Sequence, residues 1–180
     1  MKKRIYALIL GGIFALAGCP LTSIAQTAST AEPTTVTKGK PYKENWANTK
    51  VILKKKIWTV EDKNNDNYTW EDLDAGAPAY NGANATVNAD DWLVSPPLHL
   101  IAGQTYALEA GAVVGGHSGT GQRMNIAYGT GDDPTTYNEI VPTTPISGTA
   151  FGTPTTIKTT FTPTETGDYR IGFHAVSDRP

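Results

Sequence analysis

Oxygen-bearing side chains recur at alternate positions of one polar loop. Asp62, Asn64 and Asp66 occupy its first, third and fifth positions. That spacing suits Ca²⁺, which takes about six to eight oxygen ligands in proteins. An EF-hand would also need Gly at position six and Glu at position twelve, where this chain has Asn67 and Leu73. The loop either recruits calcium ligands from elsewhere in the chain or forms an Asx-rich turn that bonds to its own backbone.

The histidines do not indicate a catalytic centre. His99 alternates with apolar neighbours, as a solvent-facing strand residue does, and His117 lies in a glycine-rich loop. A Ser-His-Asp triad can be chosen on paper from Ser118, His174 and Asp168, but no nucleophile-elbow pattern supports the choice. Zinc spacings, a phosphate-binding loop and a dinucleotide fingerprint are also missing from the sequence. We therefore predict that the protein is not an enzyme.

Aromatic residues offer a second kind of chemistry, because flat rings can stack on the apolar faces of sugars. Trp46, Tyr68 and Tyr80 would form such a binding surface if they were exposed together. Three other aromatic residues are predicted to pack in the core or under loops: Trp58, Trp70 and Trp92.

The N-terminus has the composition of an export signal. Lys2, Lys3 and Arg4 precede an apolar run over 5–17, which is shorter than the roughly 20 residues of a membrane span. Two cleavage sites compete. The run 16–19 resembles a lipobox, in which Cys19, the single cysteine, would be lipidated, and Pro20 is unfavourable there. The run 23–25 has the small-x-small pattern of ordinary cleavage, so residues 1–25 are predicted to leave the mature chain.

The charge of the mature chain is mildly acidic. Removing residues 1–25 lowers the count of Lys and Arg from 15 to 12 against 17 Asp and Glu, a net charge of −5. Such a domain lacks the electrostatic footprint of a nucleic-acid-binding protein. The run 54–56 of three lysines is interpreted as a solvated strand end or turn.

Residues 26–40 are small, polar and rich in threonine, and we predict a flexible spacer there. A single domain is predicted over 41–180. Its apolar runs are short, several alternate with polar residues, and Gly- and Pro-containing turns separate them. Expected strands lie at 50–60, 92–94, 105–110, 124–128, 156–161 and 169–175. Short strands without intervening helices indicate an all-β protein, an antiparallel β-sandwich.

Several segments, taken in order, resemble one family. The chain is similar to the cleaved-adhesin or choice-of-anchor type of β-jelly-roll domain, which is common in surface and secreted proteins of Bacteroidetes. The similar segments are 41–46 (PYKENW), 58–70 (WTVEDKNNDNYTW), 90–100 (DDWLVSPPLHL), 103–106 (GQTY), 126–130 (IAYGT) and 167–175 (GDYRIGFHA).

The resemblance implies a galactose-binding-like jelly roll and structural calcium near its carboxylates. Asp90 and Asp91 are therefore the expected recruits for the loop of Asp62, Asn64 and Asp66. Members of the family usually continue into a closing strand after the segment that matches 167–175. That strand is missing here, which leaves an unpaired edge. The resemblance therefore predicts that the chain is a truncated copy, a fragment or a variant that closes differently.

The predicted function is a non-catalytic, calcium-stabilised binding or adhesion module of an exported bacterial protein. Its expected location is the outer membrane or cell surface, or the medium if the chain is released. The expected partner is a host or matrix protein, or a glycan. Two alternatives stay open: a carbohydrate-binding module proper, and a structural or assembly subunit that accepts a strand from a partner.

Overall fold

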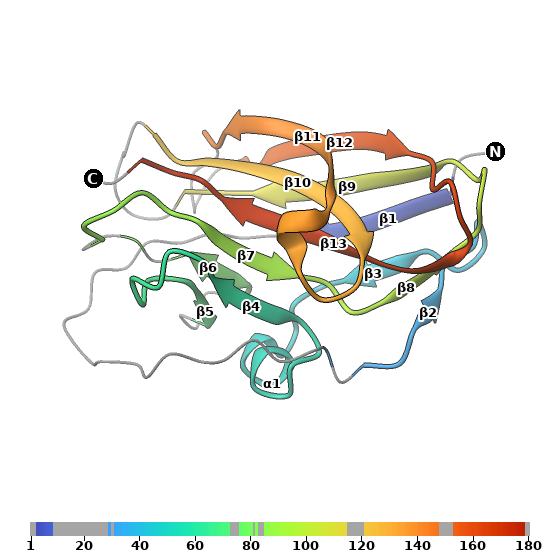
Figure 1. Ribbon diagram of the computed structural model, residues 1–180, viewed down its shortest axis with the longest axis horizontal. Coiled ribbons are helices and arrows are strands. Elements are labelled where there is room, and N and C mark those ends of the chain that lie inside the picture. Colours follow the sequence, from blue (N-terminus) through green and yellow to red (C-terminus); the bar gives the residue numbers. More distant parts are fainter. Residues whose placement is uncertain are drawn as a thin grey trace.

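The structure is a computed structural model of the 180-residue chain, and it describes residues 3–8, 29, 31–72, 76–80, 82, 85–114, 121–147 and 153–178. Two sheets face each other across an apolar core (Figure 1). The larger sheet has the order β11 (Asn138–Pro145), β10 (Arg123–Thr130), β13 (Gly167–Ala175), β7 (Asp91–Val94) and β4 (Thr59–Asp62). Beside this path, β8 (Leu98–Leu100) pairs with β13, and β2 (Thr34–Thr35) pairs with β8.

The second sheet has four strands, in the order β12 (Thr155–Phe161), β9 (Tyr106–Ala112), β1 (Lys3–Leu8) and β3 (Tyr42–Glu44). A separate hairpin of β5 (Trp70–Asp72) and β6 (Pro78–Tyr80) covers one end. The strand pairs are antiparallel except β1 with β3, β1 with β9, and β2 with β8. The all-β antiparallel sandwich predicted from the sequence is confirmed.

Strand alternation builds the core. Tyr169, Ile171 and Phe173 point from β13 into the space between the sheets, as the sequence pattern predicts. Phe173 is fully buried and its ring lies 6.0 Å from that of Trp58. Burying a side chain of this size contributes about 1.5–3 kcal/mol. The three tryptophans expected in the core or under loops, Trp58, Trp70 and Trp92, are all buried.

A small second cluster covers the other face of the larger sheet. Trp92 and Val94 alternate with Leu93 along β7, so they point away from the main core and pack with Ala127 and Tyr137. The rings of Trp92 and Tyr137 meet edge to face, with centroids 6.5 Å apart. The 3₁₀-helix η1 (Pro134–Thr136) leads into Tyr137 and holds it over the sheet.

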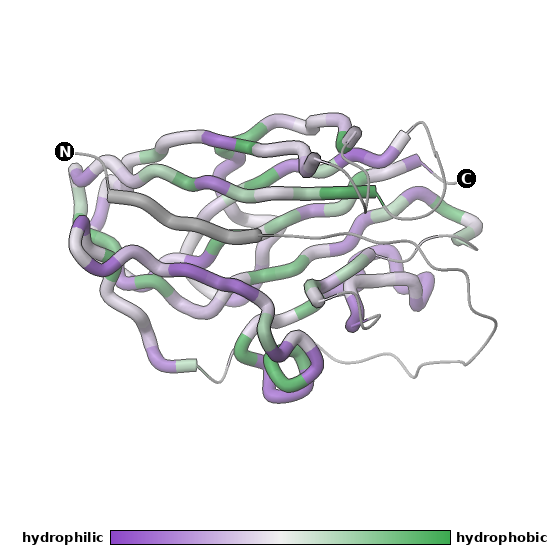
Figure 2. Tube along the Cα trace, turned by 180° about the vertical axis from the view of Figure 1, so that it is seen from behind, coloured by the Kyte–Doolittle hydropathy of each residue, from purple (hydrophilic) through white to green (hydrophobic). Residues whose placement is uncertain are grey.

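The strand predicted over 50–60 is partly wrong, because its first half is helical. Helix α1 (Thr49–Lys54) places Ile52 and Leu53 against the core and leaves Val51 exposed, and only the end of the segment enters β4. Figure 2 shows the helix as a mixture of hydrophobic and hydrophilic positions beside the sandwich. Six residues form too short a helix to be stable alone, so packing decides this element.

The flexible spacer predicted over 26–40 is wrong at its C-terminal end. Val36 is buried in the main core, and β2 pairs with β8 just before it. Further back, the Ser29 hydroxyl donates a hydrogen bond to the Ile57 carbonyl oxygen at 2.8 Å. Polar composition suggested a mobile chain, but one apolar residue and a free strand edge are enough to hold it.

Within the predicted export signal, residues 3–8 form β1, and Cys19 lies outside the described residues. None of the helices in the described part of the chain is long and apolar enough to span a membrane.

Candidate cation site at one end of the sandwich

Two aspartates of the predicted site face each other across neighbouring strands. Asp62 ends β4 and Asp91 begins β7, and the antiparallel register pairs them directly. Paired residues of this kind have Cβ atoms about 4.5–5.5 Å apart and share a face of the sheet. Asp91 alternates with Trp92 and therefore points to the same side as Leu93, toward the main core. Two carboxyl groups are thus opposed at the inner edge of the sandwich.

The fold raises the pKa of the Asp91 carboxyl group strongly. Its side chain is fully buried, with the hydrogen bond from the Asp90 N–H to Oδ2 (3.1 Å) as one polar contact. Oδ1 has no hydrogen-bond partner of good geometry. Burial raises the pKa of Asp91 to about 8, and the charges of Asp62 and Asp66 also raise it. The nearby Thr69 side chain acts in the opposite direction and lowers the pKa. Without a cation, this carboxyl group holds a proton at neutral pH.

The loop after Asp62 is tied by its own side chains. The Asn67 and Asp66 N–H groups donate to the two carboxylate oxygens of Asp62, at 2.9 and 3.3 Å. The Asn64 side-chain oxygen also accepts from the Asp66 N–H, at 3.2 Å. Asp66 Oδ1 accepts from the Tyr68 N–H at 2.8 Å, whereas its buried Oδ2 has no partner. This is the Asx-rich turn foreseen as one of the two interpretations.

The unpartnered oxygens nevertheless suit a hard cation. Asp66 Oδ2 and Asp91 Oδ1 are both buried and unbonded, and burial also raises the pKa of Asp66. Ca²⁺ would replace the proton on Asp91 and bind carboxylate oxygens directly. Within the described chain, however, no group of three His, Cys, Asp or Glu side chains is close enough to form a ready metal cluster. An ion would have to draw the loop of Asp62, Asn64 and Asp66 toward Asp91.

The structure does not bring Asp90 to the loop of Asp62, Asn64 and Asp66. Asp90 precedes β7, and its carboxylate contacts His174 instead, with Oδ1 2.6 Å from Nε2. The His174 ring stacks on Trp92, with centroids 4.0 Å apart and planes 9° from parallel. Burial lowers the pKa of His174, although the nearby Asp90 carboxylate opposes this. Adjacent aspartates therefore serve opposite faces of the sheet.

The aromatic surface predicted for sugar binding is not assembled. Trp46 is buried, with 1% of its surface exposed, and its ring packs at 4.7 Å on Trp58. Tyr68 and Tyr80 are half-buried near the acidic loop. Tyr80 meets the edge of Trp70 at 6.2 Å, and its pKa is raised by burial and then by the charge of Asp91.

A cavity of about 50 Å³ lies beside Tyr80, with Trp70, Met124 and Ile146 in its lining. Ligand pockets usually measure about 300–1,000 Å³. This cavity is too small for a sugar ring.

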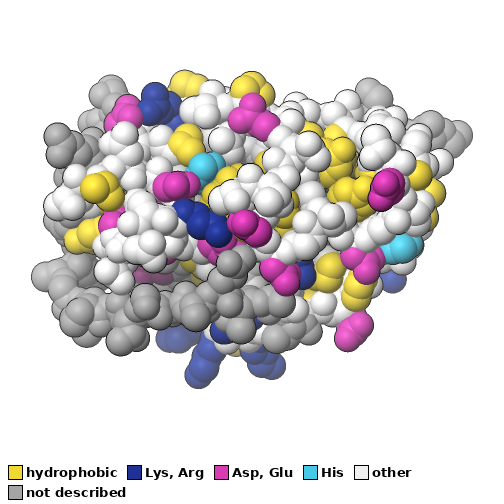
Figure 3. Space-filling model, viewed as in Figure 1, with side chains coloured by type: hydrophobic (Ala, Val, Ile, Leu, Met, Phe, Trp, Pro, Cys, Tyr) yellow, Lys and Arg dark blue, Asp and Glu magenta, His cyan; other side chains and the backbone are white. Residues whose placement is uncertain are grey.

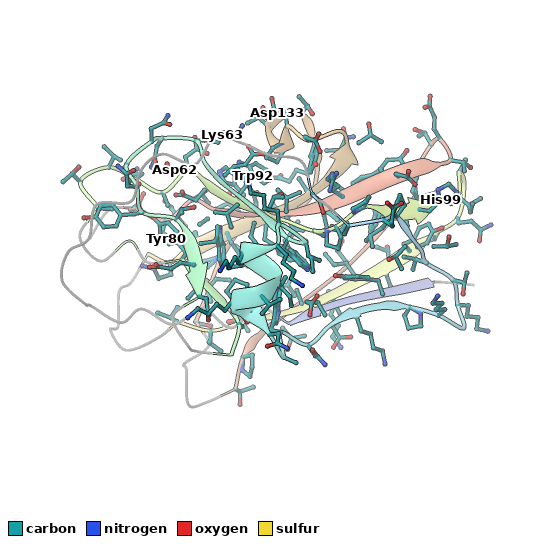
Figure 4. The ribbon with its side chains drawn as sticks, turned by 90° about the horizontal axis from the view of Figure 1, so that it is seen from below. Asp62, Lys63, Tyr80, Trp92, His99 and Asp133 are labelled. Carbon is teal, nitrogen blue, oxygen red and sulfur yellow. The ribbon has the colours of Figure 1, made fainter. Side chains whose placement is uncertain are left out.

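In the part of the chain that the structure describes, His174 and Asp168 do not form the catalytic triad considered from the sequence with Ser118. Asp168 Oδ1 lies 2.8 Å from His99 Nδ1, whereas His174 contacts Asp90. Ser118 and His117 fall outside the described residues. Figure 4 shows His99 at the opposite end of the molecule from Asp62 and Tyr80.

One charged group was not anticipated. Lys63 lies between the carboxylates of Glu61 and Asp133, at 2.5 and 3.2 Å. Figure 3 shows basic and acidic side chains gathered with a histidine on this outer face, and Figure 4 places Lys63 beside Asp133. Alternation within the run 59–63 is the sequence signal that separates Glu61 from Asp62, because successive strand residues point to opposite faces.

Comparison of the chain with protein-family models, curated proteins and solved structures gave no match.

Proposed function

We propose that this protein is a non-catalytic, calcium-stabilised binding module of an exported bacterial protein. The observation that carries the proposal is the buried Asp91 carboxyl, with an unbonded oxygen, opposite Asp62 and near Asp66. A buried carboxylate without a counter-charge is costly, and a divalent cation is the simplest group that would neutralise several at once.

The cation would act on loop geometry. The acidic loop joins β4 to the β5–β6 hairpin, and Trp70 of that hairpin donates from Nε1 to the Asp91 carbonyl oxygen at 3.1 Å. An ion bound by Asp62, Asp66 and Asp91, with the Asn64 oxygen available, would fix this end of the sandwich. Loops held in this way on a rigid scaffold commonly form binding surfaces.

Support for adhesion comes from the segments that resemble cleaved-adhesin and choice-of-anchor domains. On that basis the partner is a host or matrix protein, or a glycan, and the module works at the cell surface or after release. Cys19 would carry the lipid in an anchored form.

Thermal unfolding in calcium and in EDTA tests the cation site. At a calcium concentration of 100 times the Kd, mass action stabilises the folded state by about 2.7 kcal/mol. For a domain of this size, that raises the unfolding midpoint by about 5–10 °C. An unchanged midpoint would remove calcium from the proposal.

Two adjacent substitutions provide a matched control. Asp91→Asn keeps the shape of the protonated carboxyl but cannot supply a charge, so we expect it to abolish the calcium-dependent shift. Asp90→Asn should keep that shift, because Asp90 contacts His174 instead. Binding to panels of immobilised matrix proteins and glycans, with and without calcium, then tests the role in recognition. Absence of binding to both panels would contradict it.

A further inference from the structure

The four-stranded sheet depends on β1. β1 lies between β9 and β3 (Figure 1), and six of its residues pair with Tyr106–Gly111 of β9. Three of them, Ile5 to Ala7, also pair with Tyr42–Glu44 of β3. Among the described strands, β3 joins this sheet through β1.

The direction of β1 is the unusual feature. β1 runs parallel to both β9 and β3, whereas β12 is antiparallel to β9. A strand inserted in the opposite direction would therefore make all four strands antiparallel. Antiparallel pairing is slightly more stable per residue than parallel pairing, and sheets of one kind are favoured over mixed ones. The position between β9 and β3 suits a strand that runs against β1.

Loss of the export signal would open this position. Residues 3–8 lie within the segment 1–25 that the sequence predicts to be removed. The six paired positions of β9 would then become a free edge, and β3 would lose its connection to the sheet. Leu108 and Ala110, which point from β9 into the core, would also lie at the rim of a gap. Free edges with apolar neighbours readily take up another strand.

We propose that the position of β1 is an acceptor slot, and that in the exported protein a strand of another exported polypeptide fills it, antiparallel to β9 and β3. This proposal rests on the export part of the proposed function and is independent of calcium. The predicted mature segment before β2, residues 26–33, is small and polar. It therefore lacks the apolar alternation that a second copy would need to donate.

The slot defines the chemistry of its occupant. One inward position lies between Leu108 and Tyr42, and it requires an apolar side chain. The next lies between Ala110 and Glu44, whose carboxylate is hydrogen-bonded to Tyr42 and to Trp58 Nε1, both at 3.2 Å. A small residue fits there. The outward position between them is flanked by Glu109 and Lys43, so a polar residue is suited to it.

A peptide that meets these requirements is the direct test. We would measure its affinity for the chain that begins at Gln26 and for the full chain, in calcium and in EDTA. The probe is Lys-Ala-Thr-Val-Thr-Val-Thr-Lys, and the control is Lys-Thr-Thr-Ala-Val-Val-Thr-Lys, which has the same composition without the alternation. The chain from Gln26 should bind the probe at least tenfold more tightly than the control. The full chain should bind the probe at least tenfold more weakly, because β1 fills its slot.

A disulfide reports the direction of the added strand. The chain from Gln26 lacks the single cysteine, Cys19, so Thr105→Cys introduces one thiol just before β9, close to the end where an antiparallel probe would finish. A probe with a C-terminal cysteine should cross-link faster than one with an N-terminal cysteine if the strand is antiparallel. Equal rates, or faster reaction of the N-terminal form, would overturn the predicted direction.

Full-length Ile5→Pro provides a second way to empty the slot, because proline disrupts a central strand. It should bind the probe as the shortened chain does. If the shortened chain is unfolded alone, folding on addition of the probe supports the slot, and failure to fold with it overturns the proposal. Three other results would also overturn it: equal affinity for probe and control, dimers joined through Thr105→Cys, or an exported chain whose mass retains residues 3–8. A missing calcium effect would leave these results unchanged, so the two proposals fail separately.

Discussion

Asp90 and Asp91 are neighbours of the same type, yet the fold treats them as opposites. Asp91 is fully buried on the inner face, has an unbonded oxygen and has a pKa raised to about 8. The Asp90 side chain is 51% exposed and contacts His174, beside the small second cluster of Trp92 and Tyr137. The difference shows that the face on which a carboxylate lies, more than its neighbours in sequence, decides its chemistry.

The largest expected effect is a pH dependence that comes from Asp91. Its pKa is near 3.9 in an unfolded chain and about 8 when folded, so the folded state holds an extra proton between these values. Its stabilising contribution is complete below about pH 4 and is lost as the pH rises through about 8. In EDTA, the wild-type free energy of unfolding should therefore fall by roughly 2 kcal/mol or more between pH 5 and pH 8, relative to Asp91→Asn.

Urea unfolding of both proteins at the two pH values measures this difference. Calcium should reduce the wild-type loss at pH 8, because the cation replaces the proton. Parallel pH profiles for wild type and Asp91→Asn would show that Asp91 is not the group responsible.

A smaller effect is expected on the outer face. Replacing Asp90 with Asn removes the carboxylate that supports the charged form of His174, so the His174 pKa should fall further below its usual value. A lowered histidine pKa stabilises the folded state fully above about pH 6.5, and this contribution is lost as the pH falls. The slope is thus opposite to that of Asp91.

NMR titration of the histidine ring protons measures the shift, and His99 serves as the internal control because it contacts Asp168. A His174 pKa that does not move on Asp90→Asn would contradict the assigned pairing.

The smallest effect is expected at the second histidine–aspartate contact, which joins His99 to Asp168 and is exposed to solvent. The side chains of His99 and Asp168 are 37% and 48% exposed, and solvent screens their interaction. Asp168→Asn should lower the free energy of unfolding by less than about 0.5 kcal/mol. Chemical denaturation at pH 6 checks this, and a loss above about 1 kcal/mol would mean that the pair also positions the β8–β13 contact.

Much of the fold could be predicted where alternation extends over several residues. The strands of Tyr106–Ala112, Arg123–Thr130, Thr155–Phe161 and Gly167–Ala175 all follow from this pattern. Short elements could not be predicted in the same way. The helix over Thr49–Lys54 depends on burial of Ile52 and Leu53, and the pairing of Thr34–Thr35 depends on a distant strand edge.

The candidate site could be predicted only in part, for a similar reason. The spacing of Asp62, Asn64 and Asp66 identified the loop, and the resemblance pointed to the Asp90–Asp91 pair. Assigning Asp91 alone required the register between β4 and β7, which sequence spacing does not contain. The burial of Trp46 could not be predicted from the sequence either. Its packing partner Trp58 follows it in the chain after the helix Thr49–Lys54, and the sequence pattern did not predict that helix.

In a lipid-anchored form, the hydrogen bond from Ser29 to Ile57 would limit how far the folded domain moves from the membrane. If Cys19 is lipidated, ten residues separate the lipid from this fixed point. A fully extended chain spans at most about 3.3–3.6 Å per residue, which gives a reach of roughly 35 Å. Such a tether is comparable to the width of a small domain. A lipid-anchored form would therefore work close to the bilayer, on partners that approach the surface, rather than at the end of a long stalk.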